Sequence, residues 1–136
     1  MSDTELKDVL IGIHTRFLGT LLGTCARRFP RNADKSMDLA MKFQKAYAEH
    51  LRANDLATIA AFERAYPGHG EVMRDQNSIA ALQNAQIELE SWSEDQCRKG
   101  ITGVEATVVA ADWQIAVGLP ATLAFKQERT RVPMCH

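Results

Sequence analysis

The chain has 136 residues, of which 46% are hydrophobic and 24% are charged, and its formal net charge at neutral pH is −1. The apolar fraction is that of an ordinary globular protein and excludes wholesale disorder. The near-zero charge excludes a global field that draws the whole chain to nucleic acid or membrane. This length predicts one domain, residues 1–136, that can bury a core without disulfides or metal.

The most apolar long stretch runs from Val9 to Ala26. Its large side chains recur every three or four residues, which is the pattern of an amphipathic helix and not of a strand. Gly12, Gly19 and Gly23 share another face of this helix. A glycine inside a helix costs about 0.5–1 kcal/mol relative to alanine. The three therefore mark a candidate helix-packing face, within the chain or against a second chain, and the alternative is that they are merely tolerated.

The same stretch approaches the length of a membrane span. However, His14, Arg16 and three threonines interrupt it, and charged residues stand before it where a signal peptide has a basic start. We therefore predict a soluble helix, no membrane partner and a cytoplasmic location.

Capping residues and apolar stripes predict further helices along the chain. Ser2 and Glu5 form a capping box for the first helix, Asn54 or Asp55 is expected to cap the third, and Ser93 begins a box-like pair at which the fourth kinks or restarts. For 104–132 the rival is a strand pair, because part of it favours β structure. The fold class is predicted as all-α, a single-domain helical bundle of five to six helices. The expected ranges are 3–29, 34–53, 55–66, 78–99, 103–118 and 120–131.

The three cysteines, Cys25, Cys97 and Cys135, are odd in number and far apart. Without a secretory signal, they are interpreted as reduced thiols in a cytoplasm. No C-x-x-C pair and no metal-spaced Cys/His cluster occurs in the sequence. We therefore expect neither a metal nor a cofactor.

The local motifs of hydrolases, zinc proteases, P-loop enzymes and dinucleotide-binding enzymes are absent from the sequence. His14 is the one histidine inside the apolar arc of the first helix, where a hydrogen-bonded core histidine is a better interpretation than a Cys–His pair. No catalytic residue is assigned, and the chain is predicted not to be an enzyme.

Four basic residues follow one another near the end of the first helix: Arg27, Arg28, Arg31 and Lys35. They are candidates for contact with phosphates or a partner, although cations in a last helical turn also favour the helix dipole. The leading hypothesis is a non-enzymatic helical binding protein that occupies, bridges or inhibits a partner protein, as an oligomer or assembly subunit. The alternative is a small helical subunit of a nucleoprotein complex that contacts RNA or DNA phosphates.

Overall fold

The computed structural model describes residues 1–118, 120, 122 and 124–127. These residues are almost entirely helical and include no strand, which confirms the all-α prediction for this part of the chain. The elements are α1 (Asp3–Arg28), a 3₁₀ turn η1 (Pro30–Asn32), α2 (Ala33–Ala65), α3 (Gly70–Leu89), α4 (Glu94–Ala110) and a π-helical turn η2 (Gln114–Gly118).

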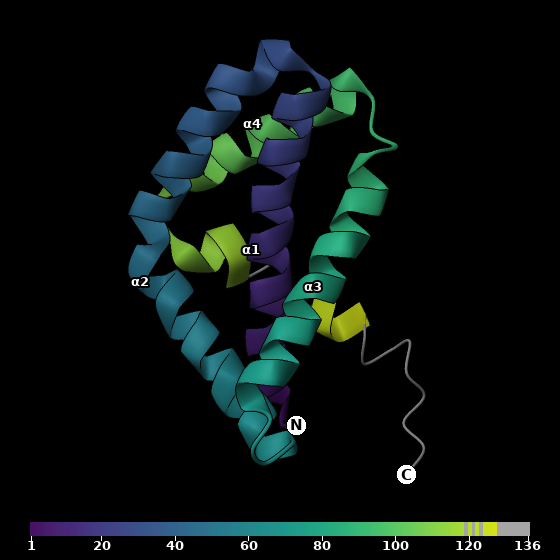
Figure 1. Ribbon diagram of the computed structural model, residues 1–136. Coiled ribbons are helices and arrows are strands. Elements are labelled where there is room, and N and C mark those ends of the chain that lie inside the picture. The colour runs from purple at the N-terminus through teal and green to yellow at the C-terminus, as the bar shows by residue number, and fades with distance from the viewer. Residues whose placement is uncertain (119, 121, 123, 128–136) are drawn as a thin grey trace.

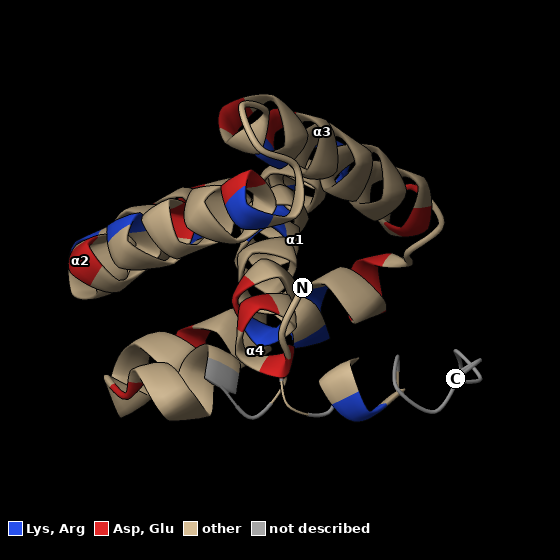
Figure 2. Ribbon diagram, turned by 90° about the horizontal axis from the view of Figure 1, so that it is seen from below, with Lys and Arg blue, Asp and Glu red and all other residues tan. Residues whose placement is uncertain are grey.

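Helix α1 is the centre of the fold. It lies between α2 and α3, and α4 crosses behind it (Figure 1). Helices α2 and α3 are joined by a tight turn and diverge from there, so that they form the two sides of an open V with α1 between them (Figures 1 and 2). By length and hydropathy α1 could also cross a membrane. A core helix meets the same test, and α1 packs against three other helices.

The two predicted capping boxes set where α1 and α4 begin. The Ser2 hydroxyl accepts the backbone N–H of Glu5 at 3.2 Å, and the Glu5 carboxylate accepts the backbone N–H of Ser2 at 2.9 Å. Ser93 and Gln96 repeat this exchange at 3.1 and 2.7 Å. Each box satisfies backbone donors that a helix start leaves open. The restart at Ser93 is thereby confirmed, and the single predicted helix 78–99 is two helices.

The break predicted near residue 54 is wrong, because α2 continues through it. Asn54 does not cap a helix: its side-chain amide donates to the carbonyl of Asp8 at 2.9 Å and ties α2 to α1. The helix bends instead at Tyr47, whose backbone is non-helical (φ −121°, ψ 18°). The buried Tyr47 hydroxyl donates to the carbonyl of Thr107 in α4 at 2.6 Å. The bend therefore lies at the residue that anchors α2 to α4.

Helix α3 begins eight residues earlier than the expected start at 78. The carboxylate of Glu63 accepts the backbone N–H groups of Gly68 and Gly70, at 2.7 and 2.8 Å, and so satisfies donors at this helix start. These bonds hold the pKa of Glu63 below its usual value. The capping group comes from the preceding helix, so the local spacing of cap residues does not reveal it.

The segment from 103 onward also differs from the expected boundaries. Residues 103–110 belong to α4, which ends where Ala111 takes a left-handed backbone conformation (φ 51°), and η2 follows. The strand alternative for 104–132 is not found among the described residues. In the predicted helix 120–131, residues 120, 122 and 124–127 are helical, and the other positions lie outside the described residues.

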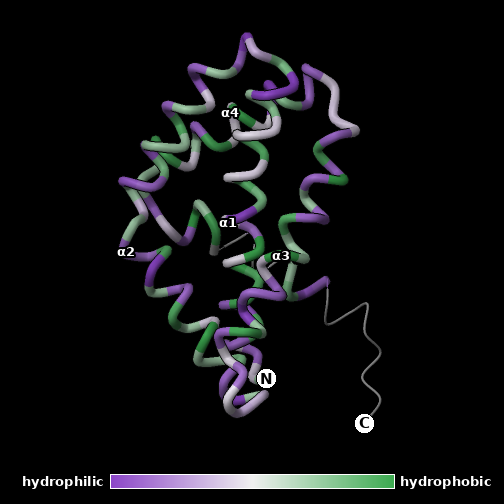
Figure 3. The backbone as a smooth tube through the Cα atoms, viewed as in Figure 1, coloured by the Kyte–Doolittle hydropathy of each residue, from purple (hydrophilic) through white to green (hydrophobic). Residues whose placement is uncertain are grey.

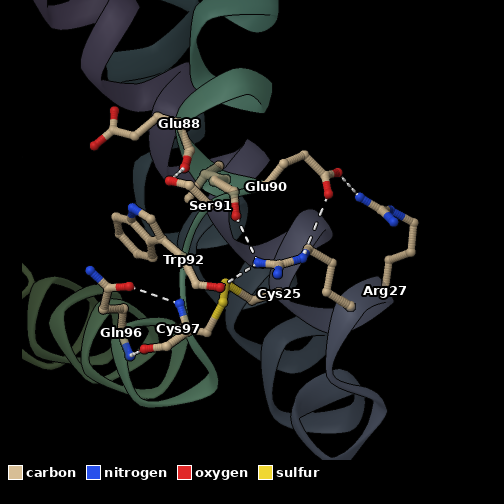
Figure 4. The surroundings of a disulfide bond; sticks show 11 residues. Cys25, Arg27, Glu88, Glu90, Ser91, Trp92, Gln96 and Cys97 are labelled. Atoms are coloured by element: carbon tan, nitrogen blue, oxygen red, sulfur yellow. Dashed lines mark hydrogen bonds and ion pairs between the residues drawn. A yellow bond between two sulfur atoms is a disulfide. The ribbon is translucent and has the colours of Figure 1, made fainter.

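The buried core lies where α1 meets the other three long helices, and it includes Leu22, Phe43, Leu89 and Val104. Figure 3 shows hydrophobic residues along each of these helices. The core contains a disulfide between Cys25 and Cys97, whose Cα atoms are 5.6 Å apart (Figure 4). The expectation of reduced thiols is therefore wrong for these two residues. Their separation of 72 positions carries no local signal, and only the packing of α1 against α4 brings them together. The cytoplasmic location loses this support and stays a prediction.

Candidate binding site

The three glycines of α1 face the inside of the V, but their surroundings differ. A Cβ atom added at Gly12 would lie 2.9 Å from Nη1 of Arg16 and 3.1 Å from Oδ1 of Asn54. A Cβ added at Gly19 or Gly23 meets no atom within 4 Å among the described residues, and both glycines are exposed. Close packing within the chain therefore occurs at Gly12 and is not found at the other two. Packing of Gly19 and Gly23 against a second chain stays a prediction.

A hollow of about 320 Å³ lies between α1 and α2 and is called here the α1–α2 hollow. Two features of the sequence make it. Helix α2 bends at Tyr47, within the part that lines the hollow, and Gly12 and Gly19 leave two positions on the facing side of α1 without a side chain. Most of the lining is apolar, and it consists of Gly12, Thr15, Arg16, Leu18, Gly19, Leu22, Ala40, Phe43, Gln44, Leu51, Asn54, Asp55 and Val104.

One part of this hollow is charged. Asp55 accepts two hydrogen bonds from Nη1 of Arg74, at 2.7 and 2.5 Å, and these bonds raise the pKa of Arg74. Nη2 of Arg16 lies 3.7 Å from the same carboxylate, and its guanidinium makes no hydrogen bond with any described residue. Nε of Arg74 also donates to Asp75 at 2.8 Å, so the two guanidinium groups face two carboxylates. Arg16 is the more loosely held of the two arginines, because its contact with Asp55 is longer than a hydrogen bond.

A second hollow, of about 370 Å³, lies on the other side of the glycines and is called the α1–α3 hollow. Gly19 lines both hollows, so the floor of the V is open on each side of it. The second lining consists of Gly19, Thr20, Gly23, Thr24, Arg27, Leu82 and Gln86.

Exposed apolar side chains edge the two hollows. On α2, Met37 and Met41 are 64% and 72% exposed. They stand seven and three residues before Gln44, a lining residue, and so lie on the same side of the helix. On α3, Ile79 stands three residues before the lining residue Leu82 and is 56% exposed. The glycines, the two hollows and these edges together are called the open face.

The predicted basic cluster lies beside the connection between α3 and α4, and of its four members only Arg27 also lines one of the two hollows. Arg27 forms an ion pair with Glu90, as Figure 4 shows. Arg28 donates to the carbonyls of Leu89 and Trp92, at 2.9 and 2.6 Å, so its guanidinium satisfies acceptors at the end of α3.

The remaining two members of the cluster are also paired with carboxylates. Arg31 lies 3.1 Å from Glu94, and Lys35 lies 3.5 Å from Glu105. Basic and acidic residues alternate over the helices in Figure 2. The structure therefore places the four predicted residues along one end of the fold, each within reach of an acidic group or a carbonyl, and this pairing gives no support to a phosphate contact.

Sequence reasoning missed the polar side of the α1–α2 hollow. In the sequence, Arg16 is a charge that interrupts an apolar run, and Asp55 resembles a helix cap. The spacing of these residues does not predict that they lie near Arg74. Within the described ranges, no group of three or more histidine, cysteine, aspartate or glutamate residues is placed to hold a metal ion. No family model matches the sequence, and neither a curated protein nor a solved structure shows significant similarity to it.

Proposed function

We propose that this chain is a non-enzymatic helical binding protein whose open face receives an amphipathic helix of a partner protein. The observation that carries the proposal is Gly19, an exposed glycine between two hollows at the floor of the V. A helix can approach the backbone of α1 closely there, because no side chain of α1 intervenes.

The dimensions of the floor suit such an occupant. The residues of α1 that line the two hollows extend from Gly12 to Arg27, which is about four helical turns or about 22 Å. A partner helix with apolar residues at spacings of three, four and seven would place them in the hollows on either side of α1. Met37 and Met41 add flexible apolar contacts along one edge, as methionines do at binding surfaces.

The charge of the face selects among partner helices. Of the two arginines in the linings, Arg27 is paired with Glu90, whereas Arg16 makes only a 3.7 Å ion pair with Asp55. An acidic side chain on the partner helix, close to Arg16, could accept hydrogen bonds from its guanidinium. The partner is thus proposed as a helix with one apolar face and at least one carboxylate beside it.

Site-directed photo-crosslinking in the native host tests the proposal. A photoreactive side chain at Gly23 should crosslink a partner protein, and the same side chain at Gly103 serves as the control. Gly103 is equally open, with no described atom within 4 Å of an added Cβ, but lies on α4. Loss of the crosslink from position 23 in a Gly19→Leu background would support docking across the floor. Equal crosslinking from both positions, or none from position 23, would overturn it.

A further inference from the structure

We propose that the α1–α2 hollow also binds a small carboxylate with an aliphatic tail of medium length. The volume of this hollow, about 320 Å³, lies within the range of about 300–1,000 Å³ that is usual for small-molecule pockets. Its lining has the matching chemistry, apolar over most of its surface with a few polar groups close together. A small ligand and a docked partner helix would exclude one another from this hollow, but binding of the ligand is measured on the chain alone and does not depend on docking of a partner helix.

The apolar part suits a flexible chain rather than a bulky ring system. It extends along α1 from Gly12 to Leu22, ten residues or about 15 Å. Leu18 and Phe43 line it from the two facing helices, and Val104 of α4 also contributes. Since an added Cβ at Gly19 meets open space, an aliphatic tail can lie directly against the backbone there.

The charged side selects a carboxylate over a cation or a neutral headgroup. Asp55 and Asp75 together hold Arg74 by hydrogen bonds, whereas Arg16 is held only by a 3.7 Å ion pair with Asp55. The guanidinium of Arg16 therefore keeps donors that a ligand can use. Nη1 of Arg16 lies over Gly12, against the floor of the hollow, and its side chain is 30% exposed. A carboxylate entering the hollow can accept two parallel hydrogen bonds from the Arg16 guanidinium, in the paired geometry that arginine favours.

Calorimetric titration of the purified protein with octanoate tests the proposal, with octylamine and octanol as matched ligands. We expect saturable binding of octanoate, with a Kd below about 1 mM, and at least tenfold weaker binding of the other two. Octylamine or octanol binding as tightly as octanoate would overturn the assignment to carboxylates. No saturable octanoate binding would overturn the site itself.

Two variants locate the site. Arg16→Gln should weaken octanoate binding by roughly tenfold or more, the usual effect of losing a charge-assisted hydrogen bond. The control Arg31→Gln removes an exposed arginine outside the hollow and should change nothing. Gly19→Leu should abolish binding by filling the hollow, while Gly103→Leu should not. Circular dichroism confirms that each variant is folded, and unchanged octanoate affinity in folded Arg16→Gln and Gly19→Leu would contradict the proposal.

Discussion

Cys25 in α1 and Cys97 in α4 are completely buried and joined by a disulfide, although 72 positions separate them in the sequence. The bond fastens the central helix to the helix that crosses behind it (Figure 4). In the loop-entropy account, a crosslink that closes a loop of this length restricts the unfolded chain and so stabilises the fold by about 4 kcal/mol.

Breaking this disulfide should therefore lower the free energy of unfolding by about 4 kcal/mol. Denaturant unfolding of the native protein and of the Cys25→Ala/Cys97→Ala variant, each at one pH, measures the difference. Of the three cysteines, one thiol should react when the protein is unfolded without reductant, and three after reduction. Three reactive thiols before reduction, with equal unfolding midpoints, would show that the bond does not form in the isolated protein.

Within the basic cluster, Arg28 should matter most for stability. Its guanidinium donates to two backbone carbonyls at and just after the end of α3. Arg28→Ala would leave these two carbonyl oxygens without this hydrogen-bond donor. We expect a loss of about 1.5–3 kcal/mol of unfolding free energy for Arg28→Ala.

Arg31→Ala is the matched control, because Arg31 makes an exposed ion pair and should cost less than about 1 kcal/mol. Filter binding of RNA and DNA at low and moderate salt belongs to the same experiment. Tight, salt-sensitive retention that is lost in an Arg27→Ala/Arg31→Ala variant would favour the nucleoprotein alternative instead.

The glycines of α1 should respond oppositely to alanine. Gly19→Ala adds a methyl group in open space and should stabilise the helix by about 0.5–1 kcal/mol. Gly12→Ala places the same methyl group against the side chains of Arg16 and Asn54. We expect the free energy of unfolding of this variant to stay unchanged or to decrease by about 1 kcal/mol. Thermal unfolding of both variants decides the matter, and an equal increase in Tm would mean that Gly12 is not tightly enclosed.

Burial holds the pKa of His14 below its usual value of 6.5. The unfolded chain therefore binds this proton more readily, so the stability that depends on neutral His14 is present above about pH 6.5 and is lost as the pH falls toward the folded-state pKa. His14 lines a further hollow, separate from the two of the open face, and Glu88 is the charged side chain among the described residues that line it with His14.

The free energy of unfolding should accordingly decrease between about pH 7 and about pH 5, and less steeply in His14→Gln. Urea titrations of both proteins at several pH values give the two slopes. Parallel slopes would exclude His14 as a source of the acid sensitivity.

The helical fold could be predicted because its signals are local. Ser2 with Glu5 and Ser93 with Gln96 carry their capping boxes in the sequence, and both form in the structure. The boundaries that failed depend on distant groups. Asn54 resembles a helix cap, but its amide bonds to α1, and the start of α3 is satisfied by a carboxylate from the end of α2.

The candidate site was predictable only in part. The shared face of Gly12, Gly19 and Gly23 follows from helical spacing alone. Whether that face is covered or open depends on the path of α2, whose bend at Tyr47 is anchored by a carbonyl 60 residues away in α4. The charged side of the hollow likewise depends on Arg16, Asp55 and Arg74, which come from three helices.

One measurement tests the open face as a binding site most directly. The partner segment found by crosslinking is prepared as a synthetic helix, and its affinity is measured for the unmodified protein, for Gly19→Leu and for Gly103→Leu. Gly19→Leu should weaken binding of this helix by at least tenfold relative to the unmodified protein, because the leucine occupies the floor between the hollows. Gly103→Leu, with the same added side chain on α4, should bind as the unmodified protein does. Equal affinity of all three forms would contradict docking on the glycine floor.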